Sequence, residues 1–129
     1  MNMAVQTPRS GDQQIEDEIV AKGKTAARVT PADIEAVIVD EFYSTAADGI
    51  EAVTGIPRTS IDLPQSAPLP TFCVLFLRNG FTVTGESACA SPENFDAEIG
   101  RKIARANAVQ KIWQLEGYLL KQRLSEGAV

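Results

Sequence analysis

The clearest pattern in the chain is a pair of apolar stretches, residues 71–77 and 81–84, on either side of Asn79-Gly80. Asn-Gly is the preferred pair for a two-residue hairpin turn, because both central residues of that turn need positive φ. With this pair at the tip, Phe76 lies opposite Val83. One face of the hairpin then carries Phe72, Val74, Phe76, Phe81 and Val83. We expect that face to be buried, so replacing Phe76 with alanine should cost roughly 3–5 kcal/mol.

The opposite face of this hairpin is mixed in character. One strand contributes apolar side chains and the other contributes polar ones: Cys73, Leu75 and Leu77, then Thr82, Thr84 and Glu86. An isolated two-stranded ribbon is marginal in water. We therefore expect a third strand, the proline-rich segment or another subunit to cover this face.

A long amphipathic helix is predicted after the hairpin. Ser91 suits the N-cap and Pro92 the first helical position. Apolar residues then recur at spacings of three and four, which is typical of a helix packed on one side. The pattern continues through residues 115–124, either as one continuous helix or with a bend near Gly117. This apolar stripe should pack on the phenylalanine face of the hairpin, and it consists of Phe95, Ile99, Ile103, Ala106, Val109 and Trp113.

The first half of the chain predicts shorter elements. A short helix is expected over residues 13–22, ended by Gly23. Thr30, followed by Pro31 and Asp33, predicts a helix start, and an apolar face of Ile34, Val37, Ile38 and Phe42 extends that helix to near Thr45. Asp48-Gly49 reads as a turn. Four prolines in residues 50–70 argue for a surface loop with at most one edge strand.

These elements predict an α+β fold: a β-hairpin, which a third edge strand can join, packed against a long C-terminal amphipathic helix and a shorter N-terminal helix. We expect a single domain over residues 15–127 and a disordered lead-in over residues 1–14. The apolar surface exceeds what one hairpin can cover. A homodimer is therefore expected, through the Leu75/Leu77 side of the ribbon or through the helix of residues 115–124.

The charge balance narrows the classes of partner. The net charge is −5, and the acidic excess falls in residues 1–70. Such a chain repels nucleic-acid phosphates, so direct nucleic-acid binding is not expected. The apolar run from Phe72 to Leu77 is too short to span a bilayer, and residues 1–10 have no signal pattern. We expect a cytoplasmic protein that does not bind membranes and whose cysteines are free thiols.

The residue types argue against catalysis. The chain has no histidine, so neither Cys73 nor Cys89 has an obvious activating base, and both are interpreted as packing residues. The two thiols are also predicted to lie beyond bridging distance. The acidic pair Asp40 and Glu41 is interpreted as exposed charge, because adjacent helical residues do not share a face. We predict no catalytic residues, no metal site and no cofactor.

A binding site is the one chemical hypothesis that the sequence supports. A basic group on the long helix lies near hydroxyl-bearing residues of the hairpin, and together they suit an anion, with an aromatic residue available for stacking. A solvated helix face is the competing interpretation. The residues of this hypothetical ligand or partner site are Thr82, Thr84, Ser87, Arg101, Lys102, Arg105 and Tyr118.

Two segments carry a resemblance to a known family. They are NGFTVTGESACASPENFDAEIGRKIARANAVQKIWQLEGYLL, residues 79–120, and AVIVDEFYSTAADG, residues 36–49. They resemble a family of small tailed-phage and prophage proteins of unassigned activity, named after members in a lytic coliphage and a Shigella phage and covering roughly residues 31–124. The resemblance implies a phage or prophage origin and expression in the bacterial cytoplasm. It brings no catalytic residues with it.

Two classes of function follow from these observations. The first is a non-enzymatic accessory protein that binds a host component stoichiometrically, as an inhibitor of a host or bacterial immune protein in counter-defence. The alternative is a sponge that sequesters a nucleotide immune signal, which needs cations and an aromatic side chain in one pocket. An enzyme is not expected.

Overall fold

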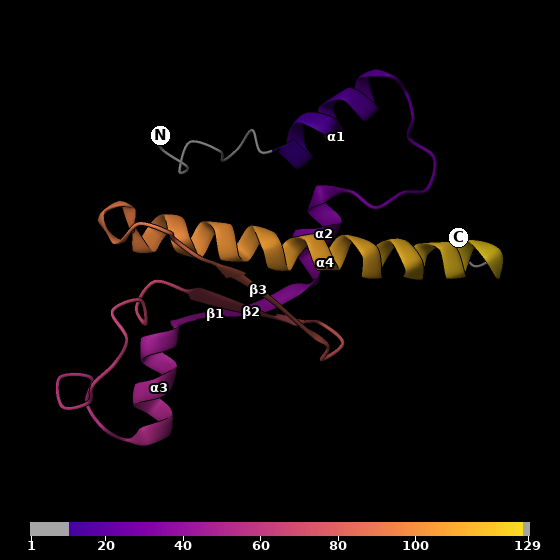
Figure 1. Ribbon diagram of the computed structural model, residues 1–129. Coiled ribbons are helices and arrows are strands. Elements are labelled where there is room, and N and C mark those ends of the chain that lie inside the picture. The colour runs from indigo at the N-terminus through magenta and orange to yellow at the C-terminus, as the bar shows by residue number, and fades with distance from the viewer. Residues whose placement is uncertain (1–10, 128–129) are drawn as a thin grey trace.

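The computed structural model describes residues 11–127, which fold as an α+β protein (Figure 1). A three-stranded antiparallel sheet in the order β1-β2-β3 packs against one long helix, α4. The predicted fold class is therefore confirmed. In chain order the elements are α1 (Gly11–Ala21), α2 (Pro31–Val37), β1 (Ile38–Thr45), α3 (Ala46–Thr54), β2 (Thr71–Leu77), β3 (Thr82–Ser87), a 3₁₀ turn (Pro92–Asn94) and α4 (Ala97–Ser125).

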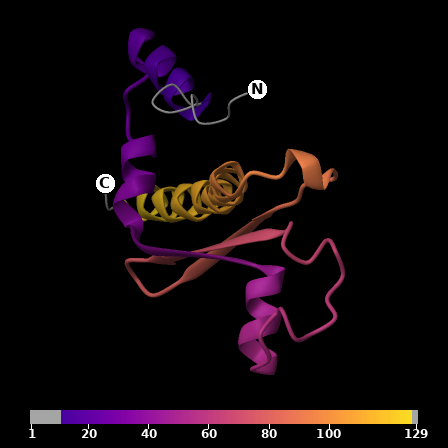
Figure 2. The ribbon, with the colours of Figure 1, turned by 90° about the vertical axis from the view of Figure 1, so that its left-hand side faces the viewer.

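The molecule is arranged in layers (Figures 1 and 2). α4 lies across one face of the sheet, and α1 lies on the side of α4 that faces away from the sheet. α3 and the loop that follows it project from one end of the sheet on the other side. α4 covers one face of the sheet, and no helix of the described chain covers the opposite face in the same way. Within residues 11–127, no helix is both long enough and apolar enough to cross a bilayer.

The third strand comes from a segment that was predicted to be helical. α2 begins as expected, with a capping box in which the Thr30 hydroxyl accepts from the Asp33 N–H and the Asp33 carboxylate accepts from the Thr30 N–H. It ends at Val37, and residues 38–45 form β1. The prediction of one helix to Thr45 was wrong: Ile38 and Phe42 fit a helical spacing, but residues 38–45 are also rich in β-branched and aromatic side chains, which favour a strand.

A helix also replaces the predicted turn at Asp48-Gly49. Thr45 caps α3 through a second capping box, accepting from the Asp48 N–H at 3.1 Å while Asp48 accepts from the Thr45 N–H at 2.8 Å. The signal for this start was present in the spacing of Thr45 and Asp48. The loop predicted over residues 50–70 is confirmed for residues 55–70, which form no strand, whereas residues 50–54 belong to α3.

The hairpin turn is one residue longer than predicted. Gly80 donates to the Leu77 carbonyl at 2.8 Å, and Leu77 donates to the Phe81 carbonyl at 2.8 Å. Gly80 has φ +91, whereas no non-glycine residue of the described chain has positive φ. This is a three-residue connection, in which a type I turn precedes a left-handed glycine, and not the two-residue turn that would need positive φ at Asn79.

The longer turn changes which residues of the two strands share a face. Leu75 pairs with Val83 and Phe76 with Thr82, so Val83 lies on the face of the β2 leucines and not, as predicted, on the face of the phenylalanines. The side facing α4 carries Cys73, Leu75 and Leu77, all at most 6% exposed. Phe72 and Phe76 are exposed on the other side. The expected burial was wrong for Phe72, Phe76 and Phe81 and right for Val83. α4 covers the Leu75/Leu77 surface that was one of the two predicted dimer contacts.

α4 packs on the sheet through small residues. Ala104 and Ala108 are 0% exposed, and Val109 and Ile112 complete the buried part of the helix. Gly85 of β3 lies directly below, where an added Cβ would meet the backbone of Ala104 and Ala108. The predicted stripe was partly wrong: Ala106 is exposed, and Phe95 lies before the helix, which Asp96 caps instead of Ser91. The helix continues through Gly117.

Polar contacts join α1 to α4 and to the segment that precedes α2. The Trp113 indole N–H donates to the Asp12 carboxylate at 3.1 Å, and Arg28 makes a bidentate ion pair with Glu16. The predicted short helix is confirmed, although it begins at Gly11 and so includes the last residues of the predicted lead-in. The remainder of that lead-in lies outside the described residues.

Candidate functional site: an exposed phenylalanine face

The sheet surface that faces away from α4 is not covered by another layer of the described chain. Because side chains alternate along a strand, the strand pairing places every second residue of β1, β2 and β3 on this surface. We call it the open sheet face. It consists of Asp40, Phe42, Ser44, Phe72, Val74, Phe76, Thr82, Thr84 and Glu86.

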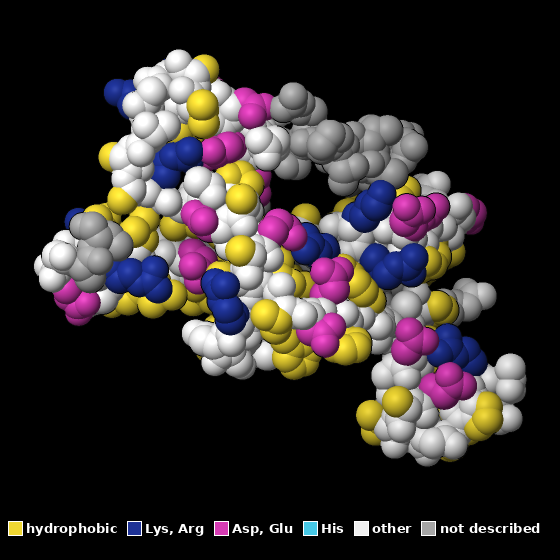
Figure 3. Space-filling model, turned by 180° about the vertical axis from the view of Figure 1, so that it is seen from behind, with side chains coloured by type: hydrophobic (Ala, Val, Ile, Leu, Met, Phe, Trp, Pro, Cys, Tyr) yellow, Lys and Arg dark blue, Asp and Glu magenta, His cyan; other side chains and the backbone are white. Residues whose placement is uncertain are grey.

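Three phenylalanines form the apolar part of the open sheet face. Phe42, Phe72 and Phe76 are 56%, 42% and 37% exposed. Phe42 and Phe76 meet edge to face with ring centroids 5.8 Å apart, a preferred aromatic geometry. Figure 3 shows hydrophobic side chains gathered along the lower side of the molecule, beside the projecting segment. An exposed aromatic cluster on a regular sheet is a common mark of a protein contact surface.

The charge on the open sheet face has one sign. Asp40 of β1 and Glu86 of β3 lie on the two edge strands, and no lysine or arginine occupies an outward position on any of the three strands. The face therefore offers aromatic rings between carboxylates. This chemistry suits a partner with apolar and basic side chains.

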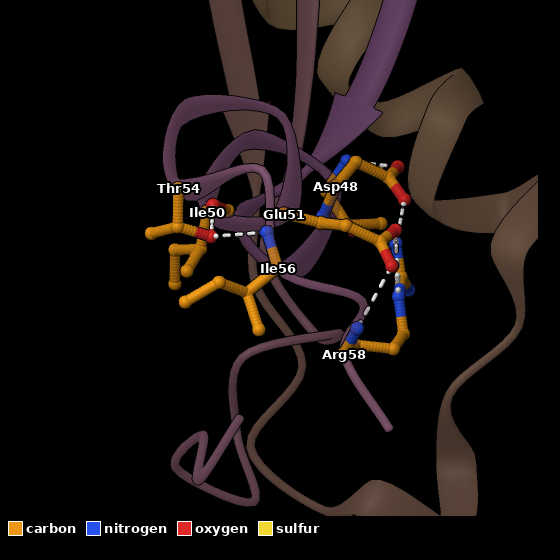
Figure 4. A network of polar contacts seen from close by, with 7 residues as sticks. Asp48, Ile50, Glu51, Thr54, Ile56 and Arg58 are labelled. Atoms are coloured by element: carbon orange, nitrogen blue, oxygen red, sulfur yellow. Dashed lines mark hydrogen bonds and ion pairs between the residues drawn. The ribbon is translucent and has the colours of Figure 1, made fainter. Parts of the chain in front are cut away.

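The projecting segment beside this face is held by its own network (Figure 4). Arg58 donates to Asp48 at 2.6 Å and to Glu51 at 3.0 Å, and the Arg58 backbone N–H donates to Glu51 at 2.8 Å. These bonds to Arg58 lower the pKa of both carboxyl groups. The Ile56 N–H also donates to the Thr54 hydroxyl at 3.2 Å. The chain is thus tied back onto α3 directly after the helix ends.

The structure does not gather the predicted binding residues into one site. Thr82 and Thr84 lie on the open sheet face, whereas Ser87 is buried against α4 and donates to the Gly100 carbonyl at 2.8 Å. Lys102 pairs with Glu98 at 3.4 Å on the same helix, and Arg101 is exposed. Lys102 and Arg101 belong to α4, the layer on the other side of the sheet from the two threonines.

Arg105 forms ion pairs with two carboxylates and has a structural role. It donates to Glu35 of α2 at 2.9 Å and 3.1 Å and to Glu41 of β1 at 3.1 Å. Tyr43 donates to the same Glu41 carboxylate at 2.6 Å. The Tyr43 hydrogen bond, followed by the charge of Arg105, lowers the pKa of Glu41, and burial raises the pKa of Tyr43. The cluster ties α2, β1 and α4 together and leaves Arg105 with no free donor pair for an anion.

The remaining predicted residue, Tyr118, lies in a different place. It lines a groove between the hairpin turn and the last turns of α4, together with Arg78 and Arg123. None of the other residues predicted for the anion site lines this groove. Sequence patterns did not single out Arg78 or Arg123, because each is an isolated cation in its own segment.

The two cysteines have different environments. Cys73 is buried at 1% exposure, and burial raises the pKa of its thiol. The Cys89 thiol donates to the Ser91 carbonyl at 3.1 Å. Both are free thiols. Residues 11–127 contain no group of three or more cysteine, aspartate or glutamate side chains arranged to hold a metal ion.

Comparison with known proteins places the chain in a family. The family described as phage protein (N4 Gp49/phage Sf6 gene 66) matches residues 29–124. Comparison with curated proteins and with solved structures gives no match. The matched residues begin just before α2 and end in the last turn of α4, so they include the whole sheet and both edges of the open sheet face. The resemblance read from the sequence is confirmed, and the chain belongs to the N4 Gp49/Sf6 gene 66 family of phage proteins.

Proposed function

We propose that this phage protein acts in the bacterial cytoplasm by binding a host protein stoichiometrically through the open sheet face. The bound protein is a host or immune component that the phage inhibits, so the role is counter-defence. The observation that carries the proposal is the exposure of Phe42, Phe72 and Phe76 on a regular sheet surface. Aromatic side chains dominate the energetics of protein interfaces, because each removes a large apolar area from water on binding.

The charge of this face supports a particular kind of partner. Asp40 and Glu86 flank the phenylalanines, and the outward strand positions hold no cation. A second copy of this chain would bring further carboxylates to the same surface and no compensating charge. A host surface with an apolar centre and lysine or arginine at its rim complements the face in both respects. The predicted homodimer stays a prediction, for which the exposed Leu119 and Leu124 of α4 are the remaining contact.

Binding without turnover is part of the same proposal. The chain has no histidine, and the carboxyl groups with lowered pKa are hydrogen-bonded to arginine or tyrosine side chains that have structural roles. The second candidate, a sponge for a nucleotide signal, is not favoured at the residues predicted for it. Ser87 is buried there and Arg105 is committed to two carboxylates.

The test is affinity capture from a host lysate with matched variants. The wild type and Val53→Ser, which removes an apolar side chain that is 88% exposed on α3, should capture the same host protein. Phe42→Ser/Phe76→Ser should lose it while keeping the wild-type circular dichroism spectrum. Calorimetry with the purified partner should give a one-to-one stoichiometry.

Three results would overturn the proposal. Equal capture by Phe42→Ser/Phe76→Ser would remove the open sheet face from the contact. Modification of an excess of the host protein by substoichiometric wild type would replace binding with catalysis. Concentration-dependent dimerisation that Phe42→Ser/Phe76→Ser abolishes would assign the face to a second copy instead of a host protein.

A further inference from the structure

A groove lies between the hairpin turn and the C-terminal turns of α4, on the helical side of the sheet. Figure 1 shows the β2–β3 turn below that half of the helix. The groove has a cavity volume of about 350 Å³, within the range of small-molecule sites. Its apolar part comes from α2, β2 and α4, with Val37, Leu77 and Leu115. These are parts of the folded core and its margin, so the groove is built on rigid elements.

Two arginines line this groove from different elements, Arg78 in the hairpin turn and Arg123 in the last turns of α4. Their pairing differs from that of Arg28, Arg58 and Arg105, which all hold carboxylates. Within residues 11–127, neither Arg78 nor Arg123 has an ion-pair partner. An arginine guanidinium presents its donors in a planar fork that matches phosphate and carboxylate oxygens. Two such groups on one groove favour an anion.

Two aromatic side chains line the same groove. Phe81 is 56% exposed and Tyr118 is 74% exposed. Exposed rings beside cations are the combination on which planar aromatic ligands stack while their charged group is held. The Asn79 side-chain oxygen accepts from the Phe81 N–H at 3.0 Å, which leaves the amide N–H groups of Asn79 to donate to a ligand.

We propose that this groove binds a small anion with a planar aromatic body, of which a nucleoside monophosphate is the simplest form. Arg78 and Arg123 hold the phosphate, and the base lies against Tyr118 or Phe81. The carboxylate of Glu116, which also lines the groove, repels a phosphate and accepts from a ribose hydroxyl or a base amino group. The ligand therefore orients with its phosphate toward the arginines and away from Glu116.

This site is independent of the protein contact proposed above. The groove is on the α4 side of the sheet, whereas Phe42 and Phe76 point to the opposite side. Loss of one function by mutation should leave the other intact, so the two proposals fail separately.

The experiment is calorimetric titration of the full chain with three probes: AMP, adenosine and inorganic phosphate. AMP, which carries both the ring and the charge, should bind at least about tenfold more tightly than either fragment. Arg78→Gln/Arg123→Gln should weaken AMP about tenfold or more. Arg101→Gln, which removes an exposed arginine elsewhere on α4, should leave AMP binding unchanged. Tyr118→Ala should weaken AMP and adenosine but not phosphate, a pattern that separates stacking from charge.

Three outcomes would overturn the assignment. The first is no AMP binding at millimolar concentration. The second is equal AMP binding by wild type and by an Arg78→Gln/Arg123→Gln protein with an unchanged melting temperature. The third is tighter binding of the acidic dipeptide Asp-Phe than of AMP, which would make the groove a site for peptide segments.

Discussion

A Cβ atom placed on Gly85 of β3 would lie 2.4 Å from the backbone nitrogen of Ala108 on α4. The same atom would lie 2.2 Å from the Ala104 carbonyl oxygen. Helix and strand thus meet backbone to backbone at this point, with no side chain between them. The two alanines on α4 are what allow the approach, since larger residues there would lift the helix from the sheet.

The first prediction concerns this contact. Gly85→Ala should destabilise the fold by at least about 1–3 kcal/mol, because the atoms that the new methyl group meets are backbone and cannot swing aside. Urea unfolding followed by circular dichroism measures the change. The matched control is Gly117→Ala, at a helical position with nothing within 4 Å, which should stabilise by about 1 kcal/mol or less. Wild-type stability in Gly85→Ala would contradict the close approach.

The second prediction compares neighbours on β2. Leu75 is 0% exposed and Phe76 is 37% exposed. Leu75→Ala should cost roughly 2–5 kcal/mol, because it leaves a cavity beneath α4. Phe76→Ala should cost on the order of 1 kcal/mol, contrary to the expectation from sequence. Thermal unfolding of the two variants decides which face of β2 is buried: a larger loss for Phe76→Ala would mean that the phenylalanine face is the buried one.

The third prediction is a pH dependence. The pKa of Glu41 is lowered from an ordinary value of 4.5, first by the Tyr43 hydrogen bond and then by Arg105. A carboxyl group with a lowered folded-state pKa adds stability that is present above its unfolded pKa and is lost as the pH falls through the folded one. Wild-type stability should therefore fall below pH 4.5 more steeply than that of Glu41→Gln. Tyr43→Phe, which removes only the hydroxyl, should reduce this slope in part; equal slopes in all three proteins would exclude the effect.

The fourth prediction uses the thiols as probes. Burial raises the pKa of Cys73, and thiolate is the reactive form, so Cys73 should not react with Ellman's reagent in the folded protein. Cys89 is only partly covered and should react. In Cys89→Ser the remaining thiol should titrate only when denaturant is added. Prompt reaction of native Cys89→Ser would show that α4 opens readily from the sheet.

Several parts of this fold were predictable because they depend on local chemistry. Thr30 caps α2 as expected, with Asp33 completing a capping box, and the hairpin and the long helix lie where the pattern predicted them. The pairing register of the hairpin is not determined by local residues. Asn79-Gly80 is compatible with a two-residue turn and with a three-residue turn that ends in glycine. Apolar residues at both odd and even positions of β2 left the choice of buried face open.

Contacts between residues that are distant in sequence determine which face of β2 is buried. Gly85 allows α4 to approach only when its own face is the inner one, and nothing near Gly85 in sequence reveals this. The same applies to β1, since Ile38 and Phe42 fit both a helical and a strand pattern until β2 provides a partner. The candidate site depended on the register, so the exposed phenylalanines were assigned to the core. The groove of Arg78, Tyr118 and Arg123 joins segments that no local pattern connects.

The three-residue turn at Arg78, Asn79 and Gly80 makes chain length, more than residue identity, the sensitive property of this segment. Loss of a single codon there would shift β3 by one position against β2 and turn every β3 side chain to the other face of the sheet. Thr82 and Thr84 would then face α4 and Val83 would join the phenylalanines on the open sheet face, although every side chain would still be present. Away from the left-handed Gly80, substitutions in this turn should therefore persist among descendants of this phage gene far more readily than in-frame insertions or deletions.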